Sequence, residues 1–216
     1  DDRPLGQSRL APTKLQWEMS IMDFQNLLSR LIEQPEKHAK FVNSLSLMEY
    51  IGARKIMKSQ QESHLCMELL EHMSEEVRHA LVLKKLALKM SDGELVGYDN
   101  KELLAGDVAR AYMQGVDAAA DNVLNPKDAY INYLLTTLIV EERAAKIYPV
   151  YEQVMNRLGY AGYFRMIVEE EKQHLAAVQS RIQKEKIDGN LIEGLRDQEE
   201  KLFQQLIVAA NAELNS

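Results

Sequence analysis

The chain of 216 residues is short of helix breakers and of cysteine. It contains 5 prolines, 10 glycines and one cysteine, and aromatic residues make up only 6% of it. The lone Cys66 cannot form a disulfide within the chain, so a reducing, cytoplasmic location is expected. No apolar run approaches the roughly 18 residues of a transmembrane helix, so no membrane span is expected.

Positive charge is scarce as well. Lys and Arg total 26 against 33 Asp and Glu, which gives a net charge of −7. Nucleic acids are bound by concentrated Lys and Arg, so no nucleic-acid partner is expected, although a small local basic patch is compatible with this balance. The abundant residues are Ala, Leu, Glu, Lys and Gln, all strong helix formers. Together with 46% hydrophobic residues, they predict a single all-α domain over residues 1–216.

Apolar periodicity and turn signals divide the chain into helices. We expect an N-terminal arm and short helix within 1–35, a bundle over about 36–186, and a short C-terminal helix within 187–216. Inside the bundle, the predicted segments are 35–58, 59–90, a long connector over 93–124 with an amphipathic stretch, 125–158 and 163–186. The second segment is placed by the capping-box pattern "SQQE" from Ser59, and the fourth by Asn125 as cap with Pro126 in the first turn.

A Glu-x-x-His pattern occurs twice, in "EEVRHALVLKKL" from Glu75 and in "EEEKQHLAAVQ" from Glu169. Each copy has a lone glutamate about thirty residues upstream. The two sets are Glu49 with Glu76 and His79, and Glu141 with Glu171 and His174. Positions 49 and 76 average 62.5, close to the proposed turn "SQQES", and positions 141 and 171 average 156, just before the predicted tight turn "LGYAG". An antiparallel hairpin therefore places each lone glutamate level with its partner Glu-x-x-His.

Both patterns lie on helical stripes that are otherwise apolar and predicted to face the core. Burying four carboxylates and two imidazoles without partners would be very unfavourable. Two divalent or trivalent metal ions would supply those partners. Carboxylate and imidazole ligands suit iron or manganese, and the i, i+3 spacing lets both residues reach one ion. A single Glu-x-x-His would more simply be a solvated ion pair, but two mirrored copies favour a metal site.

This arrangement resembles the ferritin-like superfamily of carboxylate-bridged di-iron proteins, in which two helices each supply a Glu and the other two a Glu-x-x-His. The resemblance covers about residues 36–186. It implies a four-helix bundle of two hairpins and two iron ions, with manganese or a mixed Fe/Mn pair possible. The implied ligands are Glu49, Glu76, His79, Glu141, Glu171 and His174. Glu76 and Glu171 would be the bridging carboxylates.

Three further residues bear on the site. Glu141 is preferred to Glu142 because it lies on the apolar seam of its helix, with Leu134, Leu138, Ala145 and Tyr148. His72, four residues before Glu76, could support the ligands from outside the metal site, or could be an ordinary, partly exposed helical residue. Tyr148 could hydrogen-bond a ligand, or could simply pack in the bundle.

The pattern favours a di-iron oxygenase or oxidase that activates dioxygen to oxidise or hydroxylate a small organic substrate, such as an acyl compound or an aldehyde. An electron-donor protein and a monomeric or small homo-oligomeric state are expected with it. The alternatives are a ferroxidase or peroxide-detoxifying protein of ferritin or rubrerythrin type, and a non-enzymatic helical scaffold with a structural metal site. The arms between each lone Glu and its Glu-x-x-His are shorter than in ferritin cages and more similar to those of small di-iron oxygenases.

Overall fold

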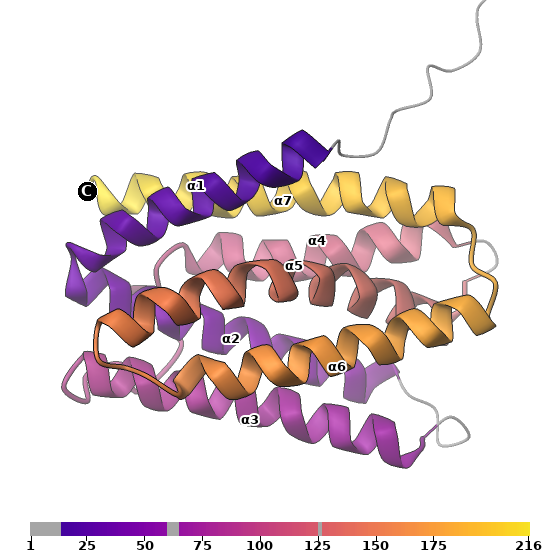
Figure 1. The fold of residues 1–216 in the computed structure, drawn as a ribbon, viewed down its shortest axis with the longest axis horizontal. Coiled ribbons are helices and arrows are strands. Elements are labelled where there is room, and N and C mark those ends of the chain that lie inside the picture. The colour runs from indigo at the N-terminus through magenta and orange to yellow at the C-terminus, as the bar shows by residue number, and fades with distance from the viewer. Residues whose placement is uncertain (1–13, 60–64, 125–126) are drawn as a thin grey trace, which may run out of the picture.

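The computed structural model describes residues 14–59, 65–124 and 127–216, and within these ranges the chain is helical with no strand (Figure 1). The elements are α1 (Lys14–Ile32), α2 (Pro35–Ser59), α3 (Met67–Met90), the short 3-10 helix η2 (Asn100–Glu102), α4 (Gly106–Val123), α5 (Ala129–Arg157), α6 (Tyr163–Lys184) and α7 (Gly189–Leu214). The all-α prediction is confirmed. The predicted N-terminal arm lies outside the described residues, apart from the first residue of α1.

Two hairpins form the part of the fold that matters for the site. Helices α2 and α3 pack along each other, as do α5 and α6, while α3 contacts α6 and α2 contacts α5. The predicted connector is largely helical: α4 lies against both α2 and α5. Helix α7 packs on α4 and α1, so α1, α4 and α7 together cover the α2 and α5 side of the two hairpins (Figure 1).

The terminal helices belong to the core rather than to its margin. The Phe24 ring of α1 lies 6.1 to 6.5 Å from the rings of Phe41, Tyr151 and Phe203. Helix α7 has 26 residues, more than the 22 of α6, so the prediction of a short C-terminal helix is wrong. Its length follows from a long apolar stripe that α1 and α4 bury, with Leu195, Phe203, Leu206 and Ala210 on it.

The predicted start of the second bundle helix is wrong. Helix α3 begins at Met67, and Ser59 is the last residue of α2. The Ser59 hydroxyl donates a hydrogen bond back to the carbonyl of Ile56, in the last turn of α2. The glutamate of the expected capping box, Glu62, lies outside the described residues.

The start of α5 is also shifted. The cap is Asp128, whose carboxylate accepts hydrogen bonds from the amides of Tyr130 and Ile131. An aspartate in this position satisfies two of the amides that the first turn leaves unpaired, so the helix begins at Ala129. The expected cap and first-turn residues, 125 and 126, lie outside the described residues.

The tight turn expected between the helices of the second hairpin is present. Gly159 and Gly162 have φ angles of 83° and 89°, a left-handed region that costs glycine little. Among the described residues, no helix has the length and apolar character needed to span a bilayer.

Candidate metal centre

The two hairpins bring all six predicted ligands to one place inside the bundle. Helices α2 and α5 supply one glutamate each, and α3 and α6 supply one Glu-x-x-His each. His72 of α3 joins them, one turn before Glu76. The seven side chains are between 0% and 9% exposed: Glu49, His72, Glu76, His79, Glu141, Glu171 and His174.

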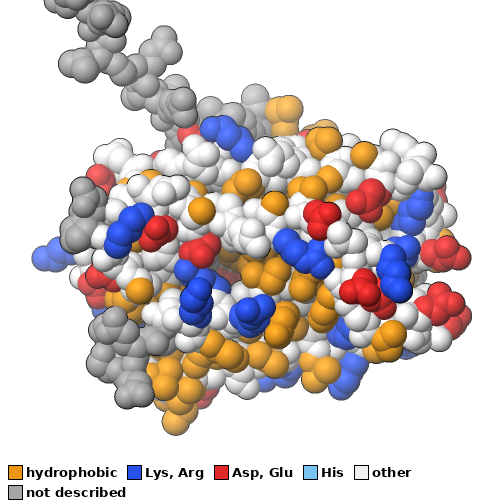
Figure 2. Space-filling model, turned by 180° about the vertical axis from the view of Figure 1, so that it is seen from behind, with side chains coloured by type: hydrophobic (Ala, Val, Ile, Leu, Met, Phe, Trp, Pro, Cys, Tyr) orange, Lys and Arg blue, Asp and Glu red, His pale blue; other side chains and the backbone are white. Residues whose placement is uncertain are grey.

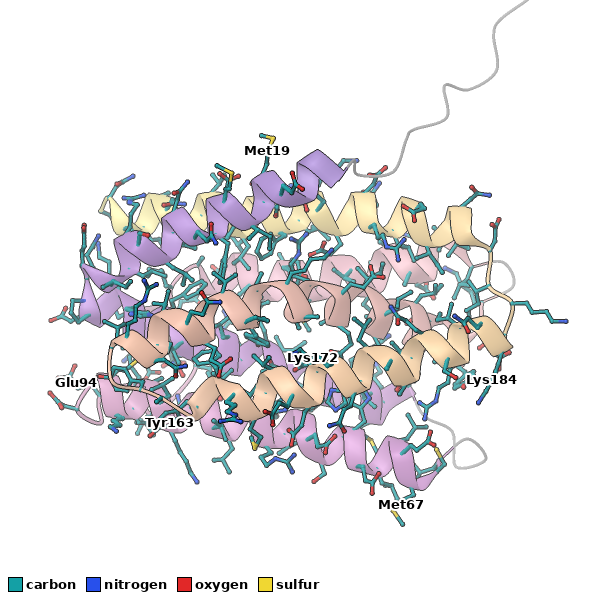
Figure 3. All side chains as sticks on the ribbon, in the orientation of Figure 1. Met19, Met67, Glu94, Tyr163, Lys172 and Lys184 are labelled. Atoms are coloured by element: carbon teal, nitrogen blue, oxygen red, sulfur yellow. The ribbon has the colours of Figure 1, made fainter. Side chains whose placement is uncertain are left out.

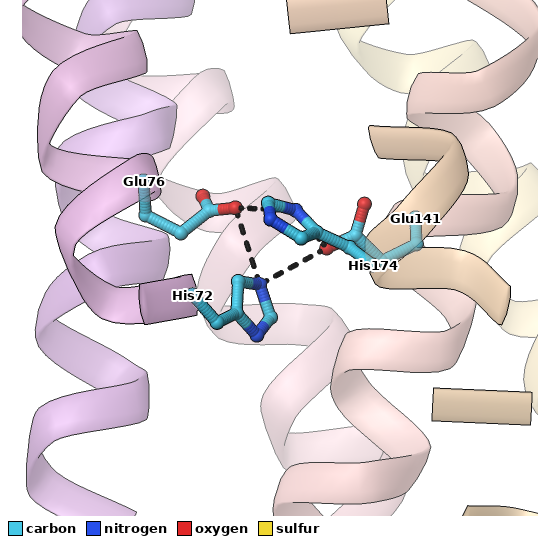
Figure 4. Close-up of side chains that lie close together, drawn as sticks. All are labelled: His72, Glu76, Glu141 and His174. Atoms are coloured by element: carbon cyan, nitrogen blue, oxygen red, sulfur yellow. Dashed lines mark ion pairs between the residues drawn. The ribbon is translucent and has the colours of Figure 1, made fainter. Parts of the chain in front are cut away.

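The seven residues form two groups of four that share Glu76. One group is Glu49, Glu76, His79 and Glu171, and the other is His72, Glu76, Glu141 and His174 (Figure 4). Within each group, one potential ligand atom from every residue lies within 4.8 Å of the others. Such spacing leaves room for one ion at the middle of each group, with Glu76 able to contribute to both.

In the group drawn in Figure 4, two imidazoles face two carboxylates. His72 Nε2 lies 3.3 Å from Glu76 Oε1 and 3.4 Å from Glu141 Oε1. His174 Nδ1 lies 3.4 Å from the same Glu76 oxygen and 3.6 Å from Glu141 Oε1. In the other group, His79 Nδ1 lies 3.1 Å from Glu171 Oε1.

Several of these buried atoms have no hydrogen-bond partner in the described part of the protein. They are His72 Nε2, Glu76 Oε1, His79 Nδ1, Glu141 Oε2 and His174 Nδ1. Buried polar atoms in proteins are nearly always paired, so a cluster of unpaired ones indicates a missing partner. All five are nitrogen or oxygen atoms that can donate a lone pair to a cation, and they point into the two groups. The residues therefore fit a pair of metal ions.

The electrostatics of the cluster show the same need for positive charge. Burial raises the pKa of Glu49 well above its usual value, and the negative charges of Glu76 and Glu171 raise it further. Burial opposes ionisation of Glu141 too, but the polar side chains of Glu171, His174 and His72 close to its carboxylate outweigh this effect and lower the pKa of Glu141 to about 2. Without a cation, these closely spaced carboxylates therefore cannot all ionise, and Glu49 keeps its proton.

Two glutamates that the sequence analysis did not identify hold the histidines from outside. Glu170 Oε2 lies 2.8 Å from His79 Nε2, and Glu75 Oε2 lies 2.8 Å from His174 Nε2. Each glutamate directly precedes the Glu-x-x-His of one hairpin and contacts the histidine of the other. A carboxylate on the far nitrogen of an imidazole fixes the ring and makes its near nitrogen a better ligand. The doubled glutamate in both motifs, "EEVRH" and "EEKQH", was the available signal.

The side chains of Glu141, Glu142, Tyr148 and His72 point in different directions, which the helices determine. Glu141 is 4% exposed and points into the cluster, while Glu142 forms a two-pronged ion pair with Arg196 of α7. The Tyr148 hydroxyl donates a hydrogen bond to Glu49. His72 does not support the other candidate ligands from outside the site. Its Nε2 faces the carboxylates of Glu76 and Glu141, and its Nδ1 lies 3.4 Å from the Tyr133 hydroxyl.

Comparisons with family models, with curated proteins and with solved structures found no match to this chain. Its function is therefore argued from the residues and geometry described above.

Proposed function

We propose that the protein is a ferritin-like di-iron oxidoreductase that uses dioxygen to oxidise a small organic substrate. The observation that supports this most strongly is the pair of buried groups that share Glu76. One iron would be held by Glu49, Glu76, His79 and Glu171, and the other by His72, Glu76, Glu141 and His174. Manganese, or one ion of each, would suit the same ligands.

The arrangement of ligands on helices supports a ferritin-like bundle. The lone glutamates come from α2 and α5, and the Glu-x-x-His pairs from α3 and α6, as in that superfamily. His72 departs from the pattern by adding a third imidazole. Its position makes one group richer in nitrogen than the other, so the two ions would differ in ligand field and in reduction potential.

A ferrous pair, when bound, supplies the electrons that reduce dioxygen. The protein's contribution is to hold the ions and to keep the site dry. Every candidate ligand is at most 9% exposed, so bulk water has little access. Glu75 and Glu170 keep the two histidines oriented, and Tyr148 holds Glu49 through its hydroxyl. This hydrogen bond places an exchangeable proton beside the group that contains Glu49.

An apolar cavity favours substrate oxidation over iron storage. It has a volume of about 110 Å³ and reaches the cluster at His72, Glu76 and Glu141. Ile51, Ile56, Met113 and Val140 make its surface largely apolar, and its polar lining beyond the cluster consists of Lys55, Gln114, Asp117, Thr136 and Thr137. A ferroxidase needs a path for hydrated ferrous ions, which polar and acidic side chains provide. An apolar space against the cluster suits an organic group and dioxygen.

The proposal is tested by loading the purified protein with Fe(II) under anaerobic conditions and then admitting dioxygen. We expect two irons per chain, consumption of dioxygen, and a monomer or small oligomer without a mineral core. Glu76→Ala should lower iron binding in both groups, whereas Lys172→Ala on the exposed surface of α6 should not. Uptake of many irons per chain into a large shell would instead indicate a ferritin. A correctly folded protein that binds no iron would refute the proposal.

A further inference from the structure

The cavity beside the cluster opens toward helix α4. Its inner end is formed by the candidate ligands His72, Glu76 and Glu141, and its outer end by Lys55, Gln114 and Asp117. Lys55 of α2 and Asp117 of α4 form an ion pair at this outer end. A molecule that enters between α2 and α4 would therefore pass charged side chains before it reaches the apolar interior.

A wider groove begins where the cavity ends. It has a volume of about 740 Å³, lies between α2 and α4, and shares Ile51, Lys55 and Gln114 with the cavity. Its size is that of a site for a nucleotide-sized ligand, whereas the cavity holds only a few carbon atoms. The two spaces are thus neighbours, with the cavity between the groove and the cluster.

The groove is cationic although the chain carries a net charge of −7. Its lining includes Arg54, Lys55, Lys58 and Arg110, and no carboxylate among the described residues. Arg110 is held in place by the Tyr98 carbonyl at 2.7 Å. Figure 2 shows a hydrophobic area on this side of the molecule that is bordered by Lys and Arg side chains, with Asp and Glu among them.

Two of these cations are available to a ligand. Arg54 and Lys58 are exposed, and neither forms an ion pair with any carboxylate in the described ranges. They lie four residues apart on α2, so they project from the same side of the helix. Arg54 also lies over the Tyr50 ring, 5.6 Å from its centroid, which leaves its N–H groups free to bind an anion. Positive charges that no described carboxylate pairs, set around the mouth of the cavity, are suited to an anionic ligand with an apolar end.

We propose that the groove and the cavity together bind a small organic phosphate, with the phosphate on Arg54 and Lys58 and a short apolar group in the cavity beside the cluster. The inference rests on the proposed function, because it identifies that apolar group as the part to be oxidised. Two cations that pair with no described carboxylate, with Arg110 nearby, match a dianion better than a monocarboxylate. The cavity volume of about 110 Å³ limits the apolar end to about four or five carbon atoms.

A long polyanion such as RNA fits the same surface poorly. Acidic residues border the groove along α4 and beyond it: Asp107, Asp117, Asp121 and Asp128. A chain of phosphates laid along this face would meet them, whereas a single phosphate ester would not. The cationic region is therefore local, which suits a small molecule.

Gly52 lies where the cavity meets the cluster. A Cβ atom at this position would lie 3.5 Å from Glu76 Oε2 and 3.9 Å from Met113 Cε, which are ordinary contacts. An alanine is therefore tolerated, while a leucine would extend into the cavity. Glycine within a helix is unfavourable relative to alanine, so its presence here is consistent with space that is kept open. Gly52→Leu and Gly52→Ala form a matched pair for testing the cavity.

The test measures binding of three probes to the iron-loaded full chain under anaerobic conditions by calorimetry: butyl phosphate, inorganic phosphate and butanol. Each methylene group that leaves water strengthens binding by roughly a factor of four, so butyl phosphate should bind at least about tenfold more tightly than inorganic phosphate. The charge-reversed double variant Arg54→Glu with Lys58→Glu should weaken butyl phosphate binding at least about tenfold. The control reverses two exposed lysines of α6, Lys172 and Lys184, and should leave it unchanged (Figure 3).

Gly52→Leu should abolish the advantage of butyl phosphate over inorganic phosphate, and Gly52→Ala should keep it. The inference is overturned if the Arg54 and Lys58 double variant binds butyl phosphate as well as the unmodified chain does. It is also overturned if butanol binds as tightly as butyl phosphate, or if an RNA oligonucleotide binds more tightly. Iron content is measured on the same samples. Failure of phosphate binding with two irons bound contradicts this inference alone, whereas loss of iron contradicts the proposed function.

Discussion

Glu141 and Glu142 are neighbours on α5, and a pair of alanine variants separates their roles. Glu141 lies in the cluster at 4% exposure, whereas Glu142 binds Arg196 near the surface of the bundle. If Glu141 is a ligand, Glu141→Ala leaves one metal with three of its four protein ligands. Glu142→Ala removes an ion pair about 2.5 Å long and leaves both metals with their full sets.

The expected magnitudes follow from linkage. A metal present at about 1,000 times its dissociation constant stabilises the native state by about 4 kcal/mol. Loss of a ligating carboxylate should weaken binding at that site by about a hundredfold, as even residues that only support a ligand affect affinity by 10- to 100-fold. The metal concentration is then only about ten times the new dissociation constant, so metal binding stabilises the native state by only about 1.4 kcal/mol. Glu141→Ala should therefore lose about 2.7 kcal/mol of metal-dependent stability.

Glu142→Ala should behave differently, because a partly exposed ion pair contributes about 1 kcal/mol or less and does so with or without metal. The assay is urea unfolding of each variant with and without Fe(II) under anaerobic conditions, where the difference between the two curves isolates the metal contribution. The reasoning is refuted if Glu142→Ala loses the metal-dependent part while Glu141→Ala retains it.

Three further outcomes are expected. Glu75→Gln and Glu170→Gln should each weaken iron binding by about 10- to 100-fold without removing a ligand, as measured by competition with a chelator. Arg143→Met should destabilise the protein by about 3–5 kcal/mol in chemical unfolding, because it leaves Glu199 and Glu200 buried with their shared cation removed. Burial lowers the pKa of His38 to about 4. Since the unfolded chain takes up this proton near pH 6.5, stability should fall by about 2 kcal/mol between pH 7.5 and pH 5, and His38→Gln should remove that part of the pH dependence.

The positions of the six candidate ligands were predictable because they depend on two regular features, the helical repeat and the symmetry of a hairpin about its turn. The i, i+3 spacing puts Glu76 and His79 on one side of α3, and equal arms about a turn place Glu49 beside them. Neither depends on where each helix starts. The predicted starts near Ser59 and Asn125 were wrong, but α2 to α3 and α5 to α6 still pair in the expected register.

What the sequence did not reveal depends on contacts between hairpins. Glu75 and Glu170 support histidines that lie 99 and 91 residues away in the sequence, and no local pattern indicates which helix faces which. His72 could not be identified as a candidate ligand, because its own helix gives no information on Glu141, which lies on α5. The groove between α2 and α4 depends on how the connector folds back, and its cations are dispersed in an acidic sequence.

The central claim is that the buried cluster holds two metal ions, and anomalous diffraction from crystals loaded with Fe(II) or Mn(II) tests it most directly. We predict two peaks inside the bundle. One should be ligated by Glu49, Glu76, His79 and Glu171, and the other by His72, Glu76, Glu141 and His174. A folded protein whose cluster shows no anomalous peak at saturating metal, or whose only peaks lie on the surface, would contradict the claim.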